Sequence, residues 1–156
     1  MTNFTTEKRK IILDNFCHPS KQIELEKLKE ISNKTKTPFF TFRNLEGICG
    51  DVLHLFVRLE SNCIKEVYFS AQQSCLITIS SSNIICSYLE KKDLESSQKM
   101  IINCQKMLKG EEYFLEDYPN LKVFSDITNF PHRFECINLV VKGLNSIFSQ
   151  VSSSVS

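Results

Sequence analysis

The alternation of side chains over residues 51–60 is the feature that most restricts how this chain folds. Aliphatic residues recur at every second position from Leu53 to Leu59, which places them all on one face of a β-strand. Ser61-Asn62 then supplies a turn, and residues 63–71 have the pattern of a return strand. The sequence therefore predicts an antiparallel hairpin with one apolar face.

Helical patterns surround this hairpin. Before it, residues 5–16 predict an amphipathic helix with Ile12 and Phe16 on one face, and Ser20 can cap a second, charged helix through about Ile31. The residues from Phe39 to Arg43 have the pattern of a first strand. After the hairpin the pattern is helical to the end. Helices are expected after Cys75, from Asp93 to Lys109 and around Leu121 to Phe124, and a last helix is expected to have Cys136 in its first turn. The predicted fold class is α+β, a three-stranded antiparallel sheet packed against several helices.

The length fits one domain. A chain of 156 residues buries enough apolar surface to fold without disulfides or a metal. Hydrophobic residues at 42% and charged residues at 24% are ordinary globular values. We expect a single domain over residues 1–148 and a disordered polar tail over residues 149–156.

The charge balance argues against nucleic-acid binding. The chain has 19 basic and 18 acidic residues. The only basic cluster, Lys8-Arg9-Lys10, fits the solvated face of the first helix. The uncharged stretch from Val67 to Leu89 contains nine serine, asparagine and glutamine residues, which excludes a membrane span. Seven cysteines, with no secretory pattern at the N-terminus, indicate the reducing cytoplasm. We expect a cytoplasmic protein.

Four residues form a candidate metal site. Cys49 and Asp51 lie together in a loop between strands, and Cys75 and Cys136 lie at the starts of two predicted helices. Thiolates with one carboxylate suit zinc or iron. The partial positive charge of a helix N-terminus favours the thiolate form of Cys75 and Cys136, and Arg133 adds a positive charge near Cys136.

The residues alone leave other interpretations open. The cysteines have no CxxC pair, so a cysteine hydrolase that uses Cys136 and His132 without a metal is an alternative. With four ligands already available, an exposed or supporting role is expected for His132. His54 is expected on the outer face of the sheet. The remaining cysteines are interpreted as packing residues: Cys17, Cys63, Cys86 and Cys104.

Three sequence motifs resemble those of the SufU branch of the IscU/NifU N-terminal family of iron–sulfur assembly proteins. They are Cys49-Gly50-Asp51 before a strand, Cys75 before a serine-rich helix, and Phe130-Pro131-His132-Arg133-Phe134-Glu135-Cys136 entering the last helix. The resemblance runs from about Ile11 to Ile147. It implies an α+β fold, a zinc site of Cys49, Asp51, Cys75 and Cys136, and partnership with a pyridoxal-phosphate-dependent cysteine desulfurase.

Two features favour the SufU branch over IscU scaffolds. IscU-type proteins have a histidine directly before the third cysteine, where this chain has Glu135, and lack much of the segment between the second and third cysteines. SufU-type proteins have an arginine that matches Arg133. The chain departs from the family pattern at His18-Pro19-Ser20 and in the longer stretch from Pro19 to Cys49.

The resemblance implies a zinc-dependent, sulfurtransferase-like acceptor of persulfide sulfur. We predict Cys49 as the acceptor because the neighbouring glycines Gly47 and Gly50 give it backbone freedom. Arg133 is the competing indication, because it can activate Cys136 instead. The alternatives are a scaffold that holds iron or a transient iron–sulfur cluster and passes it to downstream assembly proteins, and a structural zinc-binding interaction module.

Overall fold

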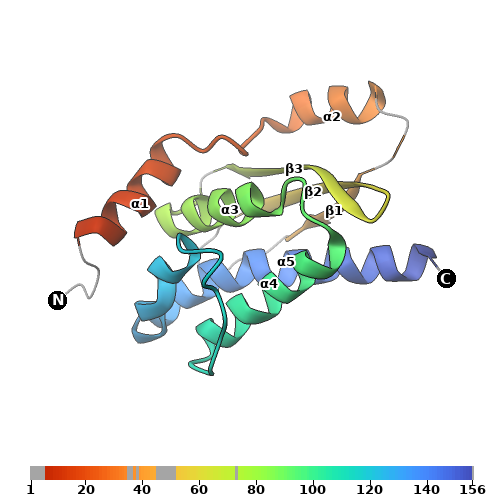
Figure 1. Cartoon of the computed structure of the whole chain (residues 1–156). Coiled ribbons are helices and arrows are strands. Elements are labelled where there is room, and N and C mark those ends of the chain that lie inside the picture. Colours follow the sequence, from red (N-terminus) through yellow and green to blue (C-terminus); the bar gives the residue numbers. More distant parts are fainter. Residues whose placement is uncertain (1–5, 35–36, 38, 45–51, 73, 156) are drawn as a thin grey trace.

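A three-stranded antiparallel sheet lies at the centre of the computed structural model, which describes residues 6–34, 37, 39–44, 52–72 and 74–155 (Figure 1). Its strands are β1 (Phe40–Arg43), β2 (Val52–Glu60) and β3 (Cys63–Gln72), in the order β1-β2-β3. Ser61 and Asn62 join β2 to β3 with positive φ angles of 53° and 60°, as a two-residue hairpin turn requires. The predicted α+β sheet and hairpin are confirmed.

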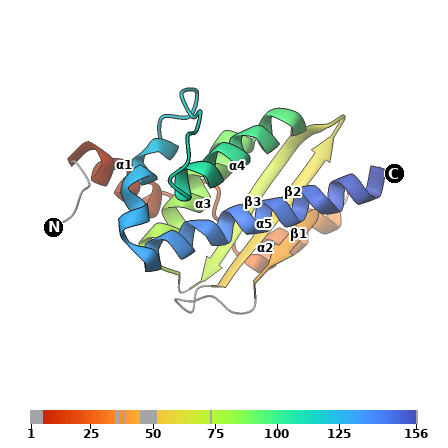
Figure 2. The same cartoon turned by 90° about the horizontal axis from the view of Figure 1, so that it is seen from below.

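One face of the sheet forms the core. Leu53, Leu55 and Val57 on β2 are fully buried, as are Val67 and Phe69 on β3. Two helices cover this face, α3 (Leu76–Leu89) against β3 and α5 (Pro131–Val155) against β1 and β2 (Figure 2). The alternation in the sequence therefore identified the buried face correctly.

Helix α3 is buried on all sides through most of its length. Every residue from Ile77 to Cys86 is buried, including three consecutive serines. Ser80 and Ser81 satisfy their hydroxyls within the helix by donating to the carbonyls of Ile77 and Thr78. Small side chains thus let α1 (Thr6–Cys17), α5 and the sheet approach the helix closely.

Helix α4 (Leu94–Leu108) follows its predicted boundaries, but α5 begins earlier than predicted, at Pro131, because proline is favoured at the first helical position. Cys136 therefore lies in the second turn of α5 and not in the predicted first turn. Helix α4 is capped by Asp93, and Gly110, with a φ of 76°, follows its end. The next helical piece is the 3₁₀-helix η1 (Leu121–Asn129), which is longer than the predicted one. Among the described residues, no helix combines the length and the apolar run that crossing a bilayer requires.

Two predictions near the N-terminus need correction. Helix α1 (Thr6–Cys17) buries Ile12 as expected, but Phe16 is 37% exposed. Helix α2 begins at Leu25 and ends at Lys34, later than Ser20 capping predicts. The cause is the edge of the sheet: Phe69 accepts from Ile23 N and donates to the Lys21 carbonyl, so this segment stays extended beside β3.

The prediction of a disordered tail was wrong for residues 149–155. Helix α5 continues to Val155, and Val151 is only 4% exposed. Val151 extends the apolar stripe one turn beyond Ile147 and Phe148, so it keeps the helix packed. Gln150 also donates a hydrogen bond of 2.9 Å to the Thr41 carbonyl on β1. The serine-rich composition concealed this apolar position.

Candidate metal centre

Cys75 is the N-cap residue of α3. Its backbone is extended, with φ −74° and ψ 166°, and its Sγ accepts a hydrogen bond from Thr78 N at 3.5 Å. The Thr78 hydroxyl lies at the same distance from this sulfur. The N–H groups of the first helical turn point toward an N-cap side chain, so this position favours a negatively charged sulfur.

Cys136 lies directly opposite Cys75. The two Sγ atoms are 3.3 Å apart although 61 residues separate the cysteines in sequence. Cys136 is on the second turn of α5 and only 4% exposed, whereas Cys75 is half-buried. The predicted proximity of these two thiols is therefore observed.

Cys49 and Asp51 lie outside the described residues, so their predicted place in the site stays a prediction. The ends of their loop are described. The backbone N–H of Asn44 donates to the Leu53 carbonyl at 3.2 Å, and the Leu53 N–H donates to Asn44 Oδ1. Val52, the residue after Asp51, accepts a hydrogen bond of 3.4 Å through its carbonyl from Ser74, the residue before Cys75.

Arg133 is exposed at the start of α5. Its guanidinium carbon lies 5.5 Å from the centre of the Phe130 ring, within cation–π range. A catalytic role for Arg133 stays a prediction. The side chain of His132 is outside the described part of the chain.

Two of the four cysteines interpreted as packing residues are completely enclosed. Cys86 and Cys104 are fully buried, and burial raises the pKa of each thiol to about 12. Both therefore remain protonated and inert. Cys63 is half-buried, but Cys17 is exposed, so the packing interpretation was wrong for Cys17.

His54 lies on the outer face of the sheet, as predicted. It is half-buried, and its ring centre lies 6.0 Å from that of Phe56. Burial lowers the pKa of His54, and the charges of Arg43 and Lys29 lower it further. Lys29 belongs to α2, which lies on this side of the sheet (Figure 1). His54 is thus remote from the buried face.

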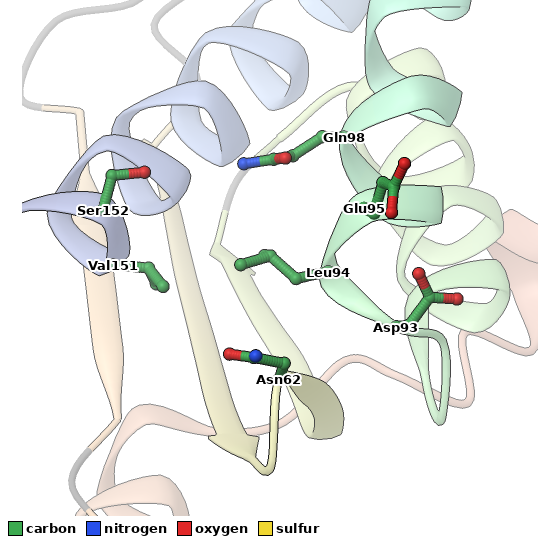
Figure 3. A pocket seen from close by; sticks show the side chains of 7 residues that line it. All are labelled: Asn62, Asp93, Leu94, Glu95, Gln98, Val151 and Ser152. Atoms are coloured by element: carbon green, nitrogen blue, oxygen red, sulfur yellow. The ribbon is translucent and has the colours of Figure 1, made fainter. Parts of the chain in front are cut away.

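A surface pocket of about 510 Å³ lies at the other end of the sheet. Figure 3 shows its lining side chains, which come from the β2–β3 turn, the start of α4 and the end of α5. They are Asn62, Asp93, Leu94, Glu95, Gln98, Val151 and Ser152. None of these is a cysteine or histidine, so the pocket is separate from the cysteine pair.

Within the described part of the chain, no three histidine, cysteine or acidic side chains form a cluster that could hold a metal. The Cys75–Cys136 pair supplies two sulfur ligands, and soft thiolates favour zinc or iron–sulfur clusters over magnesium or calcium. The donor chemistry of the described pair therefore fits the predicted metal.

Sequence reasoning missed Thr78 as a partner of Cys75. The signal was available, because a capping residue and the residue three positions later are the pair that meet at a helix N-terminus. Cysteine is absent from the usual set of capping residues, which include serine and aspartate, so the pattern was not recognised.

Comparisons with known proteins show which family the sequence matches. Residues 7–117 match the family described as NifU-like N terminal domain. The iron–sulfur cluster assembly scaffold protein IscU of Thermotoga maritima is 27% identical over 104 residues, which cover 67% of this chain and 72% of that protein. The zinc-dependent sulfurtransferase SufU of Bacillus subtilis is 23% identical over 143 residues, 91% of this chain and 89% of that protein.

Solved structures share the fold. A SufU-type protein of Fervidobacterium islandicum superposes with a TM-score of 0.71 at 22% identity, covering 89% of this chain and 94% of the other. The N-terminal part of a NifU-like protein from Brucella abortus gives a TM-score of 0.73 at 12% identity, covering 92% and 93%. The family match spans well over half of the sequence, and the chain belongs to the family of the NifU-like N terminal domain.

Proposed function

We propose that this chain acts in iron–sulfur cluster assembly as a zinc-dependent acceptor of persulfide sulfur. The sulfur donor is a pyridoxal-phosphate-dependent cysteine desulfurase. The zinc ligands are Cys49, Asp51, Cys75 and Cys136. The observation that carries the proposal is the 3.3 Å separation between the sulfurs of Cys75 and Cys136.

The separation of the two sulfurs is compatible with one shared zinc ion. Zinc–sulfur bonds of about 2.3 Å in a tetrahedral site put two sulfur ligands roughly 3.8 Å apart. A shift of about half an ångström brings the pair to that distance. Cys75 has an extended backbone and precedes α3, so it can make this adjustment without disturbing the helix.

Chain continuity supports Asp51 and Cys49 as the remaining ligands. Asp51 is bonded to Val52, and the Val52 carbonyl is held by Ser74, the neighbour of Cys75. Consecutive Cα atoms are 3.8 Å apart, so these hydrogen bonds restrict how far Asp51 lies from Cys75. Cys49 precedes Asp51 by two residues in the sequence.

The sulfur transfer is a thiolate exchange. Zinc, when bound, keeps the ligand thiols deprotonated. The Cys49 thiolate attacks the outer sulfur of the desulfurase persulfide, a new S–S bond forms at Cys49, and the desulfurase cysteine leaves as a thiolate. Cys75 and Cys136 are attached to packed helices, which limits them to small shifts, whereas Cys49 has glycines on both sides, at positions 47 and 50. Cys49 therefore moves with the least strain.

The zinc ligands are tested by elemental analysis of four variants, each with one ligand changed to alanine. We expect one zinc per chain in the wild type and loss of zinc in the Cys75→Ala and Cys136→Ala variants. Cys63→Ala is the matched control because Cys63 is also half-buried but lies in β3 at the far end of the sheet. Full zinc occupancy after loss of Cys75 or Cys136 would contradict the ligand set.

The sulfur step is tested with a persulfidated desulfurase and peptide mass spectrometry. The added sulfur is expected on the tryptic peptide 44–58, which contains Cys49. Sulfur on peptide 134–142, with Cys49 unmodified, assigns the transfer to Cys136 and makes Arg133 its activator. Arg133→Gln separates the two outcomes, because it slows the transfer only in the second case.

The scaffold function is the second candidate, because the IscU relative that matches this chain is named a scaffold protein. The same thiolates are suitable ligands for a cluster. Protein purified without added iron is expected to be colourless and to contain zinc. A stable brown cluster, together with no stimulation of desulfurase turnover, supports the scaffold instead.

A further inference from the structure

Two thiols from separate helices face each other at less than the usual contact distance of two sulfurs. Cys75 Sγ and Cys136 Sγ are 3.3 Å apart, and a disulfide requires about 2.05 Å. Closing this gap needs a movement of just over 1 Å. Cys75 can supply it because its N-cap position lies outside the helical hydrogen-bond ladder.

We propose that Cys75 and Cys136 form an intramolecular disulfide in the metal-free protein, and that this bond closes the metal site. The disulfide itself follows from the pair geometry alone. Its regulatory consequence rests on the proposed function, because the bond removes two of the four proposed zinc ligands. Metal-loaded and oxidised forms then exclude each other.

The exposure of the two thiols sets the order of the steps. Cys75 is half-buried and accessible, whereas Cys136 is 4% exposed. The Cys75 thiolate attacks a low-molecular-weight disulfide such as glutathione disulfide, forms a mixed disulfide and releases one glutathione thiolate. The Cys136 thiolate then attacks the Cys75 sulfur and releases the second. Two protein thiols are oxidised, one glutathione disulfide is reduced, and their two protons pass to the glutathione thiolates.

Three other described cysteines are poor competitors for this bond, and Cys63 lies at the far end of β3. Cys86 and Cys104 are fully buried, and burial raises the pKa of both thiols to about 12, so neither supplies a thiolate. Cys17 is exposed on α1 and is expected to stop at the mixed disulfide with glutathione.

The disulfide is tested on chelator-treated protein equilibrated in buffers of reduced and oxidised glutathione. Non-reducing tryptic mapping is expected to show peptide 66–91, which contains Cys75 and the fully buried Cys86, linked to peptide 134–142, which contains Cys136. Cys75→Ser should remove the link and Cys17→Ser should keep it. A link from either peptide to peptide 44–58, which contains Cys49, would overturn the pairing, as would a link that persists in Cys75→Ser.

A second measurement separates this inference from the proposed function. The oxidised protein is expected to take up no zinc until a reductant is added, and zinc-loaded protein is expected to resist oxidation. Zinc binding by the reduced chain without any link under oxidising buffers overturns the inference and leaves the proposed function intact. A link in a chain that binds no zinc when reduced overturns the proposed function alone.

Discussion

Helices α3 and α4 begin in the same way but at opposite ends of the sheet. The backbone of Cys75 has φ −74° and ψ 166°, and that of Asp93 has φ −67° and ψ 156°. Each side chain accepts from the backbone N–H three residues later, at 3.5 Å for the sulfur and 2.9 Å for the carboxylate. The geometry is one motif, but the capping atoms differ.

The two capping atoms differ in how well they stabilise a helix. Asp93 is one of the preferred capping residues, and the hydrogen bond from the Ser96 backbone lowers its pKa. A sulfur is a weaker acceptor, so α3 begins with a poorer cap than α4. The weaker sulfur cap lies where a second thiol is within 3.3 Å, so we expect Cys75 to contribute less to helix stability than Asp93 does.

The Gly143→Ala substitution tests whether a change in the packing of α5 on the sheet also affects the cysteine pair. A Cβ at this position would lie 2.5 Å from Leu55 Cδ1 and 2.6 Å from Phe42 Cδ2, so in Gly143→Ala either these side chains or α5 must shift. Overpacking costs about 1–3 kcal/mol, offset in part by about 1 kcal/mol of helix propensity. We expect a net loss in the free energy of unfolding, measured by urea denaturation, together with weaker zinc binding because Cys136 lies on this helix.

Lys142→Ala is the control for Gly143→Ala, because Lys142 is an exposed neighbour on the same helix. An unchanged stability and zinc affinity in Gly143→Ala would mean that Phe42 and Leu55 yield without moving α5. The two ends would then be independent of each other.

The sheet and most helices followed from the sequence because their signals are local. The alternation from Leu53 to Leu59 gave the buried face, and Asp93 with Gly110 gave both ends of α4. The start of α2 was not predictable in this way, because Phe69 on β3 holds the preceding segment extended. The last turns of α5 were missed because Val151 is a single apolar residue among serines.

The candidate site was predictable only in part. The residue types indicated a metal, but the 61-residue separation of Cys75 and Cys136 becomes a contact only through the packing of α3 beside α5. Thr78 illustrates the limit, since its contact with Cys75 depends on the cysteine acting as an N-cap. The resemblance to SufU-type proteins supplied the grouping that spacing alone did not.

The Asp93→Ala substitution tests the contribution of the α4 cap to stability. Loss of the cap is expected to lower the melting temperature by roughly 2–4 °C at neutral pH while zinc content stays unchanged. The carboxylate pKa is lowered in the folded state, so its stabilisation is present above the unfolded pKa of about 3.9 and is lost as pH falls through the folded pKa. The difference between wild type and Asp93→Ala should therefore shrink in acid. Asp93→Asn, a neutral cap, should not show that pH dependence, and zinc loss in Asp93→Ala would contradict the separation of the two ends.

Cys75→Ser carries the smallest expected effect on stability and the sharpest contrast between the two roles of this position. Serine is a preferred N-cap, so its hydroxyl should accept from Thr78 N better than the sulfur does. In chelator-treated, reduced protein we expect Cys75→Ser to be more stable than wild type by roughly a few tenths of a kcal/mol, and Cys75→Ala to be less stable than Cys75→Ser by about 1 kcal/mol. Urea denaturation of the three proteins measures this order. Because the same serine variant is expected to lose zinc, stability and metal binding should move in opposite directions at one residue. A metal-free Cys75→Ser protein less stable than Cys75→Ala would show that the sulfur is held by packing and not by its capping hydrogen bond.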